Sequence, residues 1–186
     1  MAKGLTGHEK QALLEWARHS VHNALSPEST KQAVPELPIF QDRRGAFVTL
    51  KRGGRLRGCI GTFRPSGPLY ETISDMALAA ALHDPRFPAV TLEELDRLEF
   101  EISVLSPLKK VDDVSKIEVG RHGLFVSHGM NSGVLLPQVA VEYGWDRERF
   151  LEETCAKAGL HAAAWKDGAE IETFEAEVFS ESQERS

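Results

Sequence analysis

The chain has 186 residues and a formal net charge of −6, and 41% of its residues are hydrophobic and 27% charged. These values are typical of a soluble globular protein that buries roughly 70% of the surface exposed by its unfolded chain, and they argue against generic DNA coating. No apolar run approaches the roughly 20 residues that span a bilayer, so we expect no membrane insertion. The N-terminus has no apolar signal core and the two cysteines form no Cys-x-x-Cys pair, which predicts a cytoplasmic protein.

The first predicted element is an amphipathic helix over residues 7–24. Thr6 and Glu9 have the T-x-x-E spacing of a capping box, and apolar residues recur at helical spacing from Leu13 to Leu25. This segment is therefore expected to cover one face of a core.

Two strand-like runs follow, over residues 45–51 and 55–63. They are joined by Gly53 and Gly54, a dipeptide suited to the two-residue turn of a β-hairpin. We therefore expect these runs to pair as antiparallel strands.

The two-residue turn predicts a register for this hairpin. It places Val48 opposite Cys59 and Leu50 opposite Arg57, because each step along one strand is matched by a step back along the other. Cys59 would then share a face with Val48 and Leu50, and Arg57 would point to that same face. The thiol is expected where a cationic hairpin tip meets an apolar base.

The hairpin segment is also strongly basic. Between residues 43 and 64 the chain has seven basic residues and no acidic one, in a protein that is acidic as a whole. This pattern indicates an anionic small molecule, a partner's acidic surface or nucleic acid, and its structural alternative is a solvated hairpin tip. The basic residues are Arg43, Arg44, Lys51, Arg52, Arg55, Arg57 and Arg64.

Cys59 is the first candidate for chemistry, as a nucleophile, a thiol ligand or an adduct site. It lies between Gly58 and Gly61, and glycine within a strand marks a bulge or the close approach of a backbone or a ligand. Gly58 and Gly61 are therefore candidate ligand-binding residues, and Arg57 beside them is a third. The alternative is a buried cysteine that packs as a small apolar residue, which is the role we expect for Cys155.

A helix is predicted from Pro68 to about His83, where Asp84 and Pro85 end it. The loop that follows holds Asp84 directly before Pro85 and Arg86 between Pro85 and Pro88, and the prolines limit its backbone freedom. Asp84 and Arg86 are therefore candidate ligand-binding residues.

The second half of the chain alternates strands and helices. Residues 98–105 alternate as a half-buried strand, and residues 120–136 are predicted to form a hairpin around an Asn131–Gly133 turn. No internal repeat or linker divides the chain. We therefore predict one domain over residues 1–180, with two interleaved subdomains as the alternative, and a polar C-terminal tail over residues 181–186.

Histidines supply the candidate partners for a catalytic thiol. His83 and His122 lie in loop-rich stretches, and either could act as the base of a Cys/His pair with Cys59. His19 and His22 have helical spacing but no H-E-x-x-H motif, so we predict no metal site. No residue pattern identifies a cofactor, and the signatures of P-loops, dinucleotide-binding folds and serine hydrolases do not occur.

Six separated motifs in this chain resemble those of a known family. They are Leu56–Gly61, Asp84–Pro88, Ile102–Pro107, Gly123–Leu124, Leu135–Ala140 and Lys157–Leu160. In this order they resemble the AMMECR-one domain family, also called AmmeMemoRadiSam system protein A. The similarity runs from about His8 to Phe179, and Ala89 stands where the family commonly has a further proline.

The resemblance implies an α+β fold with an antiparallel β-sheet core flanked by α-helices, and a smaller α/β subdomain packed alongside. It implies that the signature residues gather near a cleft. It also implies two partners, a Memo-like protein of dioxygenase fold and a radical SAM protein. It supplies no reaction.

We therefore expect a binding or accessory protein whose cleft is lined by Arg57, Cys59, Arg86 and His83. The cleft would hold an anionic small molecule or an acidic segment of a partner. A cysteine-dependent enzyme that uses Cys59, and an RNA- or nucleotide-binding module that uses residues 43–64, are the alternatives.

Overall fold

A computed structural model describes residues 4–26, 28 and 32–184 of the chain. It divides into two compact units. The first comprises Met1–Leu105 and Glu177–Ser186, and the second comprises Ser106–Ala176. The second unit is therefore an insertion between two stretches of chain that build the first.

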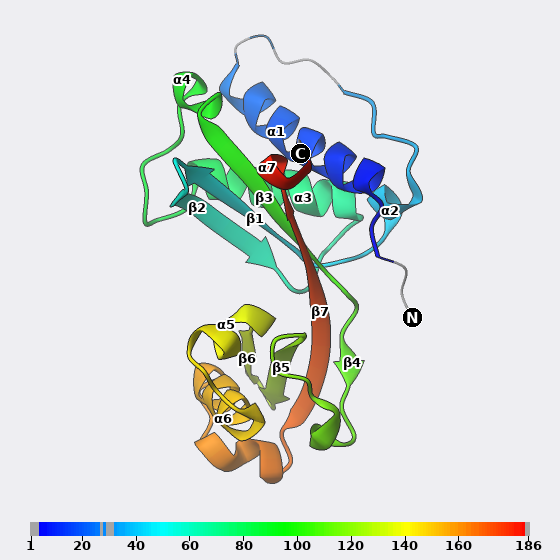
Figure 1. The fold of residues 1–186 in the computed structure, drawn as a ribbon, viewed down its shortest axis with the longest axis vertical. Coiled ribbons are helices and arrows are strands. Elements are labelled where there is room, and N and C mark those ends of the chain that lie inside the picture. Colours follow the sequence, from blue (N-terminus) through cyan, green and yellow to red (C-terminus); the bar gives the residue numbers. More distant parts are fainter. Residues whose placement is uncertain (1–3, 27, 29–31, 185–186) are drawn as a thin grey trace. The chain divides into compact units, whose positions relative to one another are not determined.

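Helices of the first unit begin at local signals in the sequence. The predicted N-terminal helix is confirmed as α1 (Gly7–Leu25), and the Thr6–Glu9 capping box closes its first turn. The short α2 (Pro38–Gln41) has its proline at the first helical position, and α3 (Leu69–Leu82) begins directly after Pro68. Figure 1 shows α1 and α3 lying together along the sheet.

The first three strands of the chain pair antiparallel in the first unit. β1 (Ala46–Arg52) lies between β2 (Arg55–Thr62) and β3 (Leu98–Leu105), and β7 (Glu170–Ser180) follows β3 in the strand order. The short α4 (Leu92–Leu95) precedes β3. β2 is therefore an edge strand.

One face of this sheet packs against α1 and α3. Alternate side chains of β1 and β3 point into the core that these helices close, and all of them are buried. The strand residues of this core are Ala46, Val48, Leu50, Phe100, Ile102 and Val104.

The turn between β1 and β2 is the predicted one. Gly53 and Gly54 have positive φ angles of 56° and 75°, and Arg52 pairs with Arg55 across the turn. Glycine adopts these angles without steric cost, which is why this dipeptide favours a two-residue hairpin.

The predicted register beyond the turn is wrong. Lys51 pairs with Leu56 but Leu50 pairs with Gly58, so Arg57 is an extra residue that bulges out of β2. A one-residue shift moves every later side chain of the strand to the opposite face. This bulge determines where the cysteine of the hairpin points.

The second unit contains the rest of the strands, two α-helices and two short 3-10 helices. β7 lies between β4 (Lys109–Lys110) and β5 (His122–His128), β6 (Asn131–Leu135) pairs with β5, and all of these pairings are antiparallel. The two α-helices are α5 (Pro137–Glu142) and α6 (Arg147–Lys157), and the two 3-10 helices are Val114–Lys116 and Ala162–Lys166.

Cys155 of α6 lies in the core of the second unit, as predicted. It is fully buried beside Phe150 and Leu151, and burial raises the pKa of its thiol. Cys155 is therefore a packing residue.

The hairpin of β5 and β6 turns two residues earlier than predicted. His128 pairs with Asn131, so Gly129 and Met130 form the turn and Asn131 begins β6. Gly133 lies within β6, where a Cβ atom would overlap the backbone of Ala158. A close approach of the end of α6, and not a turn, explains this glycine.

The fold is α+β, as predicted, with an antiparallel sheet, flanking helices and a smaller second unit. Across the described part of the chain, no helix combines the length and apolar character needed to cross a membrane.

The C-terminus differs from the predicted tail. Residues Glu181–Glu184 form the short helix α7, and residues 185 and 186 lie outside the described part. Glu181 accepts hydrogen bonds from Nε and Nη2 of Arg18 at 2.6 and 2.7 Å and from the backbone N–H of Phe100 at 3.0 Å. This carboxylate fixes the segment because it satisfies charged and backbone donors together.

We expect Glu181→Gln to lower the free energy of unfolding by about 1–2 kcal/mol, because a neutral amide replaces a charge-assisted pair whose carboxylate side chain is only 11% exposed. Urea unfolding followed by circular dichroism measures this change. The control is Gln183→Ala, an exposed position in the same helix. Equal effects of the two substitutions would show that Glu181 does not hold α7.

Candidate functional site

The structure places Cys59 on the face of the sheet opposite α1 and α3. It pairs with Thr49 and not, as predicted, with Val48, because the Arg57 bulge shifts the register. The Cys59 thiol is half-buried and free of a disulfide, and its Sγ accepts a hydrogen bond from Thr49 Oγ1 at 3.2 Å. The prediction that the thiol shares a face with Val48 and Leu50 is therefore wrong.

The backbone of Cys59 is bound by the loop that follows α3. The N–H of Cys59 donates to Asp84 Oδ2 at 2.9 Å, and its carbonyl oxygen accepts from Arg86 Nη2 at 3.2 Å. Both groups point away from β1, at the open edge of the sheet. We call the Cys59 backbone together with Asp84 and Arg86 the edge clamp, since it satisfies polar groups that an edge strand otherwise leaves open.

Asp84 is the centre of the edge clamp. Its side chain is 1% exposed and accepts from Arg86 Nε at 2.9 Å, Arg86 Nη2 at 2.7 Å and the Arg86 backbone N–H at 3.1 Å. Hydrogen bonds from the Arg86 side chain and from the Cys59 N–H hold the pKa of Asp84 well below its usual range. Asp84 is therefore a carboxylate in the folded protein at neutral pH.

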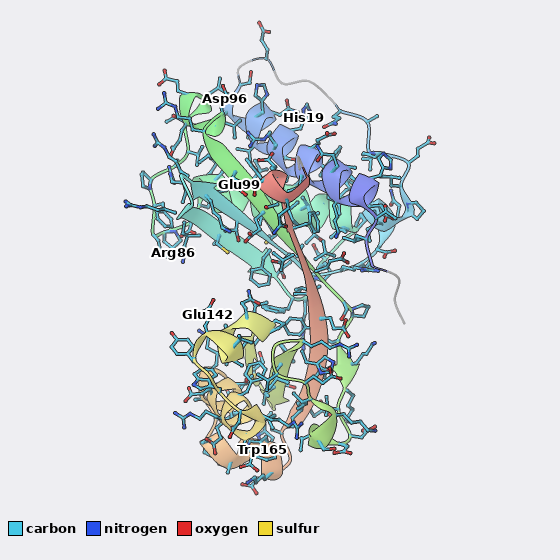
Figure 2. All side chains as sticks on the ribbon, viewed as in Figure 1. His19, Arg86, Asp96, Glu99, Glu142 and Trp165 are labelled. Carbon is cyan, nitrogen blue, oxygen red and sulfur yellow. The ribbon has the colours of Figure 1, made fainter. Side chains whose placement is uncertain are left out.

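Arg86 is fixed at one end and open at the other. Its side chain is 53% exposed, and Nη1 has no hydrogen-bond partner among the residues that the structure describes. Figure 2 shows Arg86 at the periphery of the first unit, beside β2. The pair of Asp84 and Arg86 thus presents a positioned guanidinium to solvent.

Arg57 is paired and largely buried. Its Nε and Nη2 donate to the two carboxylate oxygens of Glu94 at 2.7 and 3.0 Å, and its side chain is 12% exposed. Arg57 holds the pKa of Glu94 below its usual value. Its Nη1 is buried without a hydrogen-bond partner within the described chain. Both arginines are paired with a carboxylate, but the Arg57 side chain is largely buried while that of Arg86 is mostly exposed, so Arg57 is less available to an anion than Arg86.

Phe87 connects the two arginines. Its ring centroid lies 5.9 Å from the guanidinium carbon of Arg57 and 5.5 Å from that of Arg86, both within the range of cation–π attraction. Sequence reasoning missed Phe87, Glu94 and Thr49 as parts of this site. The sequence signal that could have identified Phe87 is its place as an aromatic residue in a loop made rigid by Pro85 and Pro88.

The two glycines that frame Cys59 are explained by the protein itself. A Cβ atom at Gly58 would overlap the carbonyl oxygen of Ala80 in α3, and one at Gly61 would overlap the ring of Phe47. Gly58 admits a helix backbone on one face of β2, and Gly61 admits an aromatic ring on the other. The protein itself fills the space beside each glycine, so a ligand cannot occupy either of these two spaces.

The candidate base His83 is exposed at the end of α3, and it makes no side-chain hydrogen bond to Cys59 within the described part of the first unit. His122 belongs to the second unit, where its Nδ1 accepts the backbone N–H of Glu118 at 3.0 Å and its Nε2 lies 3.9 Å from Glu175 Oε1. The roles of His83 and His122 as catalytic bases for Cys59 stay predictions.

The charge of the basic segment is partly neutralised in the fold. Four of its seven basic residues form an ion pair with a carboxylate, which reduces the potential that the segment presents. These four are Arg44, Lys51, Arg52 and Arg57. Among the described residues, no group of three or more histidine, cysteine and acidic side chains is arranged to hold a metal ion.

Known proteins are similar to this chain over nearly its whole length. The sequence model of a family described as AMMECR1 matches residues 14–179. Protein Mbar_A1807 of Methanosarcina barkeri is 42% identical over 188 residues, which cover 96% of this chain and 93% of that protein. Protein MJ0810 of Methanocaldococcus jannaschii is 42% identical over 191 residues, covering 97% and 94%.

A solved structure is also similar. The crystal structure of the uncharacterised protein PH0010 from Pyrococcus horikoshii matches with a TM-score of 0.78 and 42% sequence identity. The match covers 94% of this chain and 92% of that chain.

We expect Asp84→Asn to lower the free energy of unfolding at pH 7, because the substitution removes the charge that binds Arg86 and the Cys59 N–H. A carboxyl whose pKa is lowered by folding stabilises the protein above its unfolded pKa of about 3.9, and this contribution is lost as the pH falls towards the folded pKa. The difference between the two proteins should therefore stay constant from pH 7 to about 5 and shrink below about 4.

Urea unfolding at a series of pH values measures this difference. The matched control is Asp75→Asn, an exposed aspartate in α3. A difference for Asp84→Asn that equals the control, or that persists undiminished at the lowest pH, would contradict the role given to Asp84.

Proposed function

The chain belongs to the AMMECR1 family, and from this premise we propose that it is a binding or accessory protein whose edge clamp recognises an anionic group. The observation that carries the proposal is the state of Arg86. Asp84 and Phe87 fix its guanidinium, yet more than half of the side chain is exposed and Nη1 is unused within the described chain. A guanidinium that is already ordered loses little entropy when it binds a carboxylate or a phosphate.

The anion is an anionic small molecule or an acidic segment of a partner protein. The exposed end of Arg86 and the hairpin tip at Arg55 provide positive charge on a chain that is acidic as a whole. The partners proposed from the family resemblance are a Memo-like protein and a radical SAM protein. A positive site on an acidic protein would orient such partners during encounter as well as bind them.

A cysteine-dependent enzyme is the second candidate function, and the contact between Thr49 and Cys59 favours it. The Thr49 hydroxyl donates to Cys59 Sγ at 3.2 Å and so orients the sulfur, and the thiolate is the nucleophilic form of a cysteine. A nucleophilic thiol also needs a base within hydrogen-bond reach, and the described part of the first unit provides no histidine bonded to Cys59. The geometry therefore supports binding better than catalysis.

Binding of RNA or another nucleic acid has less support. Phosphate contacts depend on unpaired basic side chains, and most of those in residues 43–64 are engaged by carboxylates. A single fixed guanidinium contacts one anionic group, whereas nucleic-acid affinity depends on neutralising many phosphates along the backbone.

We expect Arg86→Lys to weaken binding of a fluorescein-labelled hexaglutamate peptide about tenfold, since the lysine ammonium keeps a charge for Asp84 but loses the free Nη1 donor. Fluorescence anisotropy at low ionic strength measures the affinity. Arg55→Lys at the exposed hairpin tip is the matched control and should change the affinity less than twofold. Equal affinities for wild type and Arg86→Lys, with both folded, would refute the proposal.

Thiol labelling separates binding from catalysis. A cysteine nucleophile requires that iodoacetamide labels Cys59 in the native protein faster than it labels an unfolded cysteine peptide, because an activated cysteine is present as thiolate in a larger fraction at neutral pH. We expect Cys59 to label no faster than the peptide, and the buried Cys155 to label only after unfolding. Mass spectrometry of both cysteines across pH 6–9 gives the rates, and rapid native labelling of Cys59 would favour the enzyme.

A further inference from the structure

The outer edge of β2 continues past the edge clamp. Because the Cys59 N–H and carbonyl both bond outward, Thr49 and Cys59 form a pair without mutual backbone hydrogen bonds. Such pairs alternate along an antiparallel ladder, so Phe47 and Gly61, two positions further on, form another. The N–H and carbonyl of Gly61 therefore point outward from the sheet.

These outward groups of Gly61 are open in the part of the chain that the structure describes. Gly61 is half-buried, and no backbone or side-chain partner for its N–H or carbonyl lies outside the β1 ladder within the described part of the chain. The equivalent groups of Cys59 are both bonded to the edge clamp. The open N–H and carbonyl of Gly61 thus lie two residues along β2 from the Cys59 N–H and carbonyl, which are already bonded.

We infer that Gly61 is the docking point for an extended acidic segment of a partner protein, which adds to the edge of β2 as a short strand. This inference rests on the proposed function, because it names the occupant of the anion site at Arg86. One residue of the segment pairs with the N–H and carbonyl of Gly61, and a nearby glutamate or aspartate of the segment reaches Arg86.

A peptide fits this edge better than a phosphate or a nucleic acid. A phosphodiester oxygen can accept from the Gly61 N–H, but the donor for the Gly61 carbonyl would have to come from another part of the ligand, such as a ribose hydroxyl or a base amino group. A peptide main chain offers an acceptor and a donor at the spacing of a strand, and so satisfies both groups. An exposed strand edge with an unpaired N–H and an unpaired carbonyl is the usual template for strand addition.

The acidic character of the segment follows from the neighbouring charges. Gly61 and Cys59 lie roughly 7 Å apart along the strand, and Arg86 bonds the Cys59 carbonyl, so a glutamate near the docked residue can reach the free Nη1. Residues 43–64 contain no acidic side chain, and the Asp84 carboxylate of the edge clamp is buried and bonded to Arg86. Charge complementarity therefore selects an acidic occupant over a basic one.

The edge clamp also limits the docking. Asp84 and Arg86 occupy the Cys59 groups that a longer strand would need, so a partner can pair only at the Gly61 end of β2. This arrangement prevents indiscriminate edge-to-edge pairing with other chains and makes affinity depend on the acidic side chain.

Amide exchange in the full-length, ¹⁵N-labelled protein tests this inference. The probe is the capped peptide Thr-Val-Glu-Val-Glu-Val-Thr, and the matched probe carries lysine at both glutamate positions. At saturating acidic peptide, we expect exchange of the Gly61 amide proton to slow at least tenfold, while the Gly54 amide at the hairpin turn stays unchanged. The lysine peptide should leave both rates unchanged.

The outcomes distinguish this inference from the proposed function. If the acidic peptide shifts the Arg86 Nε resonance but leaves Gly61 exchange unchanged, strand addition is wrong and anion binding stands. If neither this peptide nor hexaglutamate binds, both proposals fail. Equal protection of Gly61 by the lysine peptide or by octauridylate RNA would overturn the acidic peptide as the occupant.

Discussion

The buried carboxylate of Asp84 is the interaction on which the site depends. It binds a strand backbone and an arginine at once, and so joins the loop after α3 to the edge of β2. A buried carboxylate remains charged only where donors and a countercharge surround it, and here the Arg86 side chain and two backbone N–H groups do so. The exposed end of Arg86 is positioned because its other end is held in this way. The proposed anion site is therefore a consequence of how an edge strand is protected.

The bulge at Arg57 also shapes the site, because it turns each later side chain of β2 to the opposite face of the sheet. Gly58 then turns toward α3, where only a glycine fits against Ala80, and the neighbouring Cys59 turns to the opposite face. The bulged Arg57 reaches Glu94 and Phe87, so a basic residue that looked available in the sequence forms an internal pair. One extra residue thus decides both the environment of the thiol and the charge around it.

Two motifs that are separated in the sequence form one structural unit. The Leu56–Gly61 segment provides the edge strand, and the Asp84–Pro88 loop provides the carboxylate and guanidinium that bind it. Their function is therefore best considered together. A fixed arginine beside an open backbone donor and acceptor supports the proposed capture of a partner segment. Among the described residues, no base is hydrogen-bonded to the neighbouring thiol, as catalysis would need.

The sequence alone determined the elements whose signals are local. The capping box of α1, the two glycines of the hairpin turn, the alternation of β3 and the burial of Cys155 were all predictable, because each depends on residues a few positions apart. It also indicated Cys59, Asp84 and Arg86 as candidate site residues. The tertiary structure decided the register of β2, the contact of Asp84 with Cys59, the helix α7 and the pairing of Arg57 with Glu94. These features depend on hydrogen bonds and packing between residues far apart in the chain, and residue spacing carries no information about such contacts.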